Sequence, residues 1–410
     1  MTKKEARDII HRIFNYIDGS DEYDEQYDCI LGHPALYFFH SKDELDKWIE
    51  EFLNSKETFD KYDLYYFINK MIKFLVGPYD SHTKLVMTKS DLLPIQFKFI
   101  DNKIYVIRVT RAMEKALFGE LVAINGVDIE TLKSEIEAMT CYSTKEYLEI
   151  AIQAGLSTPN ILRSLPSFDK SPTNIIYTVS HNGKNEDFTF DLEHIKDYPS
   201  YEFTPKKNYS YRIQNDALIL VYNSCEDIEA MQKFVQEIST VADKEHITKF
   251  IVDLRGNSGG NSRIIDPLID FLRGKVVVTL IDEYVFSSGR MACVSLSKIG
   301  SHFIGTNIST TLNAFGNNPK PLYIDELDFR VSRSTKYFQY DNKLQGRSYN
   351  KTNFKDSFKD PEYFNSLDPL LFQPNELVYR PLEDYVNGTD SQLNAAINYL
   401  KELEQKNSMI

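Results

Sequence analysis

Two adjacent serines, Ser287 and Ser288, are the first candidates for chemistry because of their place in the chain. They follow the apolar run VVVTLI (276–281), which is typical of a buried strand, and they open a segment whose pattern predicts a helix. The first turn of a helix carries free N–H groups and the positive end of the dipole, which favour developing negative charge. This position suits a nucleophile, but serine is also a preferred helix-capping residue, so both interpretations remain open from this motif alone.

A glycine-rich turn is the second candidate. The sequence KFIVDLRGNSGGNS (249–262) runs from an apolar strand into Gly256, Gly259 and Gly260, where the backbone must turn sharply and lie open. Exposed N–H groups in such a turn can bind an anion or line an oxyanion hole. The turn lacks the GK[ST] of a phosphate-binding loop and the GxGxxG spacing of a dinucleotide site. A plain turn at the end of a strand is the alternative.

Taken in order, DLRGNSGG, strand-SSGRM-helix, IGTNISTTLNAFGN and SRSTKYF form a pattern that resembles the C-terminal-processing (tail-specific) proteases and the tricorn core. The pattern is most similar to the tricorn-like subgroup, which includes interphotoreceptor retinoid-binding protein-type domains. The resemblance covers residues 211–340 and the tail through EDYVNGTD, and it reaches back to DSHT (80–83) and to a PDZ-like segment. It implies a serine peptidase that needs no metal or organic cofactor.

The resemblance also implies roles for individual residues. The family's Ser-x-x-Glu motif maps its nucleophile onto Ser287. The oxyanion hole maps onto Gly259 or Gly260 together with the backbone N–H of Ser288. Two such donors on the developing oxyanion would lower the barrier by several kcal/mol.

The general base is implied by the same resemblance. The tail-specific branch carries a lysine in FGKG, but here the corresponding stretch ends in Asn317. The tricorn-like branch uses an upstream histidine preceded by serine, which maps onto His82 with Ser81 as its orienting neighbour. A histidine that only caps a turn after Gly77-Pro78 is the alternative.

The sequence departs from the family pattern at several positions. Arg290 replaces the glutamate that follows the nucleophile, GTNISTTLNAFG replaces a Gly-Glu-x-Thr-Gly-Gly run, and Gln373 and Asn375 stand where acids are frequent. The carboxylate that orients a tricorn-type site is not identified, and Glu376 is only one candidate. These departures leave open a catalytically inactive peptide- or ligand-binding homologue. A crotonase-type acyl-CoA enzyme is a third alternative, which shares the layout but not the upstream Ser-His pair.

Composition excludes several classes of protein. The chain has 410 residues, 42% of them hydrophobic, and a net charge of −13 with no long basic block, so nucleic acid is not an expected partner. No apolar run is long enough for a membrane span, and the N-terminus lacks a signal-peptide core, so a cytoplasmic protein is expected if Met1 is the native start. The four cysteines are scattered and predict neither disulfides nor a zinc site: Cys29, Cys141, Cys225 and Cys293.

The elements that must position these residues follow from periodicity. Helical spacing up to Gly77-Pro78 predicts a helical N-terminal region, 1–85. The hairpin expected around Asp101-Asn102, and the strand LVAI before Asn125-Gly126, favour a PDZ-like module at 90–140. A mixed linker region is expected at 141–205, helical up to Leu165 and then a strand pair.

Apolar strands alternate with amphipathic helices after residue 211, which predicts βα units around a largely parallel sheet. The serine peptidase catalytic domain is therefore expected at 206–410. The whole is expected to be an α/β protein with a crotonase/ClpP-like catalytic domain, a PDZ-like β module and a helical N-terminal region. Its expected partner is a peptide or protein substrate, cut through Ser287 and His82. The oligomeric state is not predicted.

Overall fold

Three amphipathic helices open the chain, and each begins at a capping residue. Thr2, Ser41 and Asp60 each form a capping box with the acid three residues later, which satisfies otherwise unpaired N–H groups of the first turn. The third helix ends before Gly77, whose φ is 70°, as predicted. The helices span α1 (Lys3–Asp18), α2 (Lys42–Asn54) and α3 (Lys61–Val76).

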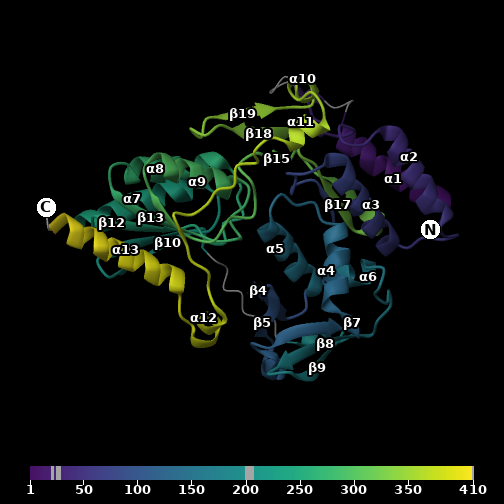
Figure 1. Ribbon diagram of the computed structural model, residues 1–410, viewed down its shortest axis with the longest axis horizontal. Helices are drawn as coiled ribbons and strands as arrows, with labels where there is room; N and C mark the ends of the chain where they lie inside the picture. The colour runs from purple at the N-terminus through teal and green to yellow at the C-terminus, as the bar shows by residue number, and fades with distance from the viewer. Residues whose placement is uncertain (20–22, 25–28, 199–206, 409–410) are drawn as a thin grey trace. The chain divides into compact units, whose positions relative to one another are not determined.

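The computed structural model describes residues 1–19, 23–24, 29–198 and 207–408 (Figure 1). The chain divides into two units: unit 1 is Met1–Tyr201 with Asn313–Leu370, and unit 2 is Glu202–Leu312 with Leu371–Ile410. The predicted division into four regions is finer than this and stays a prediction. It differs from the units in one respect, because residues 313–370, assigned above to the catalytic domain, fold with unit 1.

An antiparallel sheet of order β4-β5-β6-β8-β9 follows the N-terminal helices in unit 1, with β7 paired to β6. The hairpins at Asp101-Asn102 and Asn182-Gly183 form as predicted, and their Asn residues have the positive φ that such tight turns require. The strands are β4 (Ile95–Ile100), β5 (Lys103–Val109), β6 (Glu120–Ile124), β7 (Val127–Asp128), β8 (Asn174–His181) and β9 (Lys184–Asp191). The helical segments around them are η1 (Arg111–Ala116), α4 (Ile129–Ala138), α5 (Lys145–Leu156), α6 (Pro159–Ser164) and η2 (Ile195–Asp197).

Two three-stranded sheets in unit 1 bring distant parts of the sequence together. In the sheet β16-β17-β3, Ser332 pairs with Lys84, so the SRST segment lies beside the DSHT segment. The sheet β15-β18-β19 joins neighbouring strands, and a short β1-β2 pair completes the set. The strands are β1 (Tyr23–Asp24), β2 (Cys29–Ile30), β3 (Lys84–Met87), β15 (Ala314–Gly316), β16 (Leu322–Ile324), β17 (Phe329–Ser332), β18 (Lys336–Tyr340) and β19 (Gly346–Tyr349). The remaining helices are η4 (Asp325–Leu327), α10 (Phe354–Ser357) and α11 (Pro361–Asn365).

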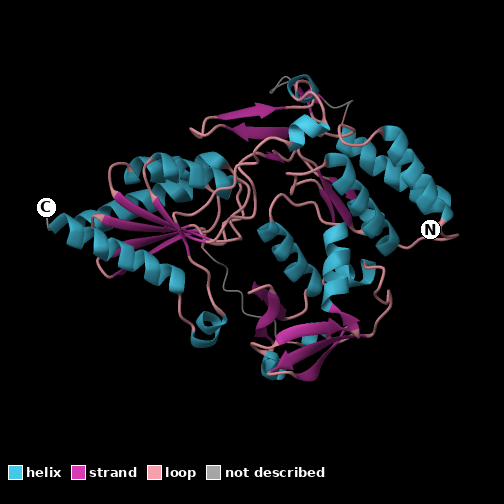
Figure 2. Ribbon diagram, in the orientation of Figure 1, coloured by secondary structure: helices cyan, strands magenta, loops and turns pink. Residues whose placement is uncertain are grey.

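Unit 2 is built on one sheet of order β10-β11-β12-β13-β14-β20, parallel except for the β10-β11 pair. One face packs on α13, because Ile219, Ile251 and Val278 form a core with Ile397. The opposite face is covered by helices that include α7 and α8, as Figures 1 and 2 show. The strands are β10 (Tyr209–Gln214), β11 (Ala217–Tyr222), β12 (Lys249–Asp253), β13 (Val276–Ile281), β14 (His302–Gly305) and β20 (Glu376–Leu377). The helices are α7 (Ile228–Lys244), η3 (Ser262–Ile265), α8 (Asp266–Leu272), α9 (Ser288–Lys298), α12 (Leu382–Asn387) and α13 (Ser391–Ser408).

The predicted α/β class and the βα units after residue 211 are confirmed by this sheet. Cys141, Cys225 and Cys293 are free and buried, and the side chain of Cys29 lies outside the described residues. Across the described ranges, no helix is both long enough and apolar enough to cross a membrane.

Candidate active site

Ser287 occupies a strained turn between β13 and α9. It stands at the N-cap position with φ 52° and ψ −117°, a backbone conformation that residues other than glycine rarely adopt. Its side chain makes no capping hydrogen bond to the helix. The alternative that Ser287 serves as a helix cap is therefore not supported. A sharp strand-to-helix turn that carries a strained serine is the geometry of a nucleophile elbow.

The glycine-rich turn packs directly on this serine turn. A Cβ added to Gly259 would lie 2.8 Å from Cβ of Ser287 and 2.8 Å from the backbone N of Ser288. The Ser288 hydroxyl donates to the carbonyl of Gly260 at 2.6 Å. Unit 2 thus brings together Ser287, Ser288, Gly259 and Gly260, the residues onto which the family resemblance maps the nucleophile and the oxyanion hole.

The hydrogen bonds within the turn distinguish the two glycines. The N–H of Gly259 donates to Oδ1 of Asn257 at 2.9 Å, and the Asn257 amide in turn donates to the carbonyl of Tyr222 at 2.9 Å. For Gly260 and Ser288, no hydrogen bond from the backbone N–H is found to any residue that the structure describes. The buried Asn257 was not identified from the sequence. Its place between Gly256 and Gly259, where a side-chain acceptor can close a turn, is the signal that could have found it.

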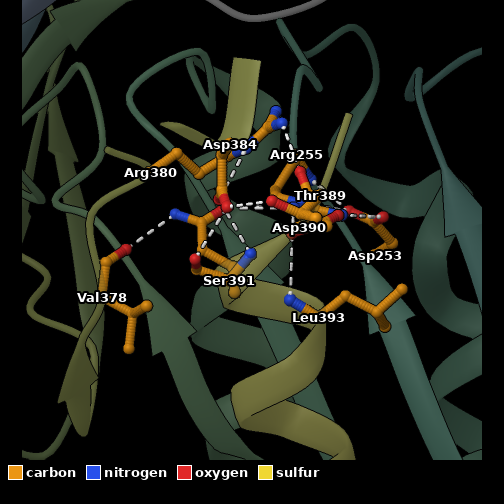
Figure 3. Close-up of polar contacts among 10 residues, drawn as sticks. Asp253, Arg255, Val378, Arg380, Asp384, Thr389, Asp390, Ser391 and Leu393 are labelled. Atoms are coloured by element: carbon orange, nitrogen blue, oxygen red, sulfur yellow. Dashed lines mark hydrogen bonds and ion pairs between the residues drawn. The ribbon is translucent and has the colours of Figure 1, made fainter. Parts of the chain in front are cut away.

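Arg255 anchors the same turn to the start of α13 (Figure 3). Its guanidinium donates to both carboxylate oxygens of Asp253, at 2.8 and 2.7 Å, and to Asp390 at 2.8 Å. Asp390 also accepts the N–H of Leu393 at 3.0 Å, in the first turn of α13. Gly256 is held from another side, because its N–H donates to Asp282 at 2.9 Å. These contacts fix the loop that leads into the glycines.

This network pairs one cation, Arg255, with two carboxylates, Asp253 and Asp390. Burial alone would lower the pKa of Arg255, but its ion pairs with Asp253 and Asp390 raise that pKa above its ordinary value. Burial alone would raise the pKa of Asp390, but the Arg255 guanidinium holds it below its ordinary range. Arg255 and Asp390 are therefore both charged at neutral pH, and their pairing offsets the cost of removing these charges from water.

The residues that depart from the family pattern have local roles in unit 2. Arg290 is buried, and its guanidinium donates to the carbonyls of Thr311 and Leu312 at 3.1 and 3.0 Å. The Asn375 side chain accepts the N–H of Phe303 at 2.7 Å, and Gln373 is exposed. Glu376 bonds His302 at 2.8 Å.

The predicted base, His82, lies in a turn of unit 1 that is organised by Asp80. One carboxylate oxygen of Asp80 accepts the N–H of His82 at 2.7 Å and the N–H of Thr83 at 3.0 Å. The other oxygen bonds Nε2 of His33 at 2.9 Å. Asp80 and His33 are both fully buried. Neither was identified from the sequence as a site residue, although Asp80 stands inside the DSHT motif.

The SRST segment forms hydrogen bonds with this turn. The Ser332 hydroxyl donates to the carbonyl of His82 at 2.7 Å, and the Ser334 hydroxyl donates to Asp80 at 3.1 Å. Arg333 is fully buried, with its guanidinium 4.2 Å from the centre of the Tyr16 ring and bonded to the Tyr16 carbonyl. Two motifs 250 residues apart thus form one structure in unit 1.

Ser81, the predicted neighbour of the base, is buried beside Ser143, with 3.4 Å between the two hydroxyl oxygens. Its carbonyl accepts the Tyr147 hydroxyl at 3.0 Å, and Lys84 donates to that hydroxyl at 2.8 Å. Asn317 donates to the Thr335 hydroxyl at 2.7 Å. The joint action of His82, in unit 1, with Ser287, in unit 2, stays a prediction.

Among the residues that the structure describes, no group of three or more His, Cys, Asp or Glu side chains is arranged to hold a metal ion.

Comparison with known proteins gives a fold. No protein-family model matches the sequence, and no curated protein matches it. The structure is similar to that of mature CPAF complexed with lactacystin, with a TM-score of 0.59, 11% identity and 98% of each chain covered. It is also similar to a crystal structure of mature CPAF, with a TM-score of 0.58, 12% identity and 97% of each chain covered. A photosystem II D1 C-terminal processing protease matches at a TM-score of 0.45 and 9% identity over 91% of this chain and 93% of that one, which is too low to support an inference. The chain therefore shares the fold of CPAF.

Proposed function

We propose that the protein is a serine peptidase with Ser287 as its nucleophile and His82 as its general base. The observation that carries the proposal is the conformation of Ser287, with φ 52° and ψ −117° at the start of α9 and no capping hydrogen bond. Strain of this kind costs about 1–3 kcal/mol and persists where the surrounding structure demands it, often at functional sites. The fold shared with CPAF and the resemblance of the motifs to tail-specific and tricorn-type peptidases support the same function.

The proposed reaction has two halves. The Ser287 hydroxyl oxygen bonds to the peptide carbonyl carbon while its proton passes to His82, and His82 then gives that proton to the leaving amine as the C–N bond breaks. Water next attacks the acyl-enzyme, loses a proton to His82 and releases the new carboxyl terminus. Ser287 regains its proton at the end, so the cycle needs no further co-reactant.

The oxyanion hole is proposed to use the backbone N–H groups of Gly260 and Ser288. These two groups remain available, whereas the N–H of Gly259 is already bonded to Asn257. Gly259 is then proposed to contribute by having no side chain, which lets the glycine turn approach Ser287 and Ser288 closely. Each lost donor of this kind costs about 100- to 1,000-fold in rate.

The assignment of His82 is supported by its neighbour in unit 1. A Cβ on Gly316 would lie 3.7 Å from Cε1 and 3.8 Å from Nδ1 of His82. Gly316 belongs to the Phe315-Gly316-Asn317 stretch, in which the tail-specific branch carries its lysine. The His82 imidazole therefore lies beside the stretch that corresponds to the lysine-bearing motif of the tail-specific branch. Ser81 is proposed to hold the turn through its contacts with Ser143 and Tyr147.

The substrate is proposed to be an extended peptide or protein segment. The sheet of β4, β5, β6, β8 and β9 with α4 is proposed to be the PDZ-like module, and unit 2 the crotonase/ClpP-like catalytic part. The five-stranded order leaves β4 and β9 at its edges, and an edge strand offers backbone groups to which a peptide can add as a further strand. The chemistry needs no metal or cofactor.

Peptide hydrolysis tests the proposed function. The purified protein is incubated with a complex peptide mixture, and new termini are identified by mass spectrometry. Cleavage is expected with the wild type and with Ser297→Ala, a control serine on the same helix, but not with Ser287→Ala. Cleavage that is unchanged in Ser287→Ala contradicts the proposed nucleophile. If folded wild type binds peptides and cuts none, the protein is instead a binding homologue of these peptidases.

A further inference from the structure

A buried carboxylate with an unusual set of partners lies inside the DSHT turn. Asp80 is fully buried, yet four hydrogen-bond donors converge on it. They are the N–H groups of His82 and Thr83, the Ser334 hydroxyl and the ring of His33, at 2.7 to 3.1 Å. A carboxylate that accepts several such bonds is held in one orientation and in its charged form.

The protonation state of His33 follows from its partners. Its Nδ1 accepts the backbone N–H of Ala35 at 3.1 Å, and a backbone N–H can only donate. The proton of the ring therefore sits on Nε2 and points at Asp80, which leaves His33 neutral. The His33-Asp80 pair therefore carries a net charge of −1, located on the Asp80 carboxylate, which is hydrogen-bonded to the backbone N–H of His82.

The surroundings of Asp80 place this charge where it acts on His82. Burial alone would raise the pKa of Asp80, but the hydrogen bonds from His33 and Thr83 and a positive charge on His82 hold that pKa well below its ordinary range. Lys84 on β3 and the buried thiol of Cys141 are the other titratable groups that interact with it. If protonated His82 stabilises the Asp80 carboxylate, the carboxylate must stabilise protonated His82 equally, because the interaction is mutual.

We propose that Asp80, oriented by His33, is the positioning residue of the base: it fixes the Ser81-His82 turn through the His82 backbone N–H and favours the protonated form of His82. This inference rests on the proposed function in assigning His82 as base. It supplies a carboxylate where the sequence alone identified none. Asp80 acts through the backbone and through its charge, in contrast to a carboxylate bonded directly to the catalytic ring.

The substitution Asp80→Asn discriminates between positioning and general packing. Asparagine has nearly the same size, but its NH₂ group cannot accept a hydrogen bond, so it must oppose one of the four donors. His33 cannot adapt by moving its proton, since Nδ1 faces the N–H of Ala35.

His33→Gln can still donate to Asp80, whereas His33→Leu cannot. Asp325→Asn, an exposed acid in unit 1, is the matched control.

Two measurements test the inference, one of which does not depend on activity. NMR titration follows the imidazole of His82, assigned from the resonance lost in His82→Gln, and a fluorophosphonate probe measures the rate of acylation at Ser287. Folding of each variant is checked by circular dichroism and by the fluorescence of Trp48, the single tryptophan of the chain.

In Asp80→Asn, the titration midpoint of His82 is expected to fall and acylation to slow at least tenfold, while Asp325→Asn matches the wild type. His33→Gln is expected to retain more activity than His33→Leu.

An unchanged His82 midpoint in folded Asp80→Asn overturns the inference. If Asp80→Asn does not fold, Ser334→Ala removes one donor and should slow acylation, and an unchanged rate overturns the inference. If the wild type is not acylated but the His82 midpoint still falls, the proposed peptidase function fails and the positioning role stands.

Discussion

At the scale of single residues, the candidate site depends on backbone conformations that most side chains avoid. Ser287 has φ 52°, Gly259, which lies against it, has φ 106°, and the next residue, Gly260, has φ 134°. Glycine adopts such angles without steric cost, but Ser287 can hold its angle only because its neighbours enforce it. The glycines are therefore expected to matter for chemistry through the space that they leave open.

Gly259→Ala tests this expectation. The new Cβ would lie 2.8 Å from both Cβ of Ser287 and N of Ser288, so the serine turn must shift, and with it the proposed donor N–H of Ser288. Fluorophosphonate acylation is expected to slow by about 100-fold or more, the cost of losing one such donor.

Gly274→Ala is the matched control, because Gly274 also has a positive φ, 76°, but an added Cβ would meet no atom within 4 Å. It should lose roughly 1 kcal/mol of stability and keep its acylation rate. Equal rates in the two variants would contradict a close approach of Gly259 to the serine turn.

At the scale of elements, the glycine turn is held by the start of a helix 135 residues later in the chain. Arg255 connects Asp253, at the end of β12, with Asp390, which precedes α13. The same helix covers one face of the sheet, where Ala396 and Ile397 contact the strand residues. The C-terminal helix thus contributes both to the core of unit 2 and to the position of the candidate oxyanion loop.

Arg255→Ala is expected to destabilise the protein by up to about 3–5 kcal/mol, the cost of breaking a fully buried pair, because it leaves two partly buried carboxylates without their cation. Arg255→Lys should recover only part of this loss, since lysine cannot bond both oxygens of Asp253 in the same way. Urea denaturation followed by circular dichroism measures the free energy of unfolding. Arg273→Ala, which breaks an exposed ion pair with Asp270, should change it little. An equally small change for Arg255→Ala would show that the network does not hold the loop.

Periodicity and turn residues predicted many of these elements. The hairpin at Asp101-Asn102, the end of α3 before Gly77 and the helix after Ser287 are confirmed, because each depends on residues that are adjacent in sequence. The joint role of Asp80 and His33 could not be predicted, since His33 and Ser334 come from segments that only the fold brings beside Asp80. The same holds for Arg255, whose partners are separated by more than a hundred residues. The predicted site residues themselves remain proposals.

At the scale of the whole molecule, buried ionisable groups set the pH range in which the chain stays folded. Burial tends to raise the pKa of Asp80, Asp384 and Asp390, but their hydrogen bonds and cations lower it below the ordinary value. Burial raises the pKa of Tyr65 and Tyr177 above the ordinary value. The acids are therefore charged and the phenols neutral in the folded state.

These shifts predict loss of stability at both ends of the pH scale. A carboxyl with a lowered folded pKa stabilises the protein above its unfolded value, near 4, and that contribution is lost as the pH falls through and below it. A phenol with a raised folded pKa stabilises the protein below its unfolded value, near 10, and the contribution is lost as the pH rises above it. Urea midpoints measured across the pH range should form a plateau that declines below about pH 4 and above about pH 10. A midpoint that stays constant from pH 8 to 12 would contradict the buried neutral phenols.

The most direct test of the account is the rate at which a fluorophosphonate probe labels the protein, followed by intact mass and by peptide mapping. If Ser287 is the nucleophile and His82 its base, a single adduct is expected on Ser287 in the wild type and in Ser297→Ala, with no adduct in Ser287→Ala and much slower labelling in His82→Ala. Folded wild type that gains no adduct, or an adduct on another residue, would contradict the claim that Ser287 is an activated nucleophile. Equal labelling of wild type and His82→Ala would contradict the claim that His82 activates it.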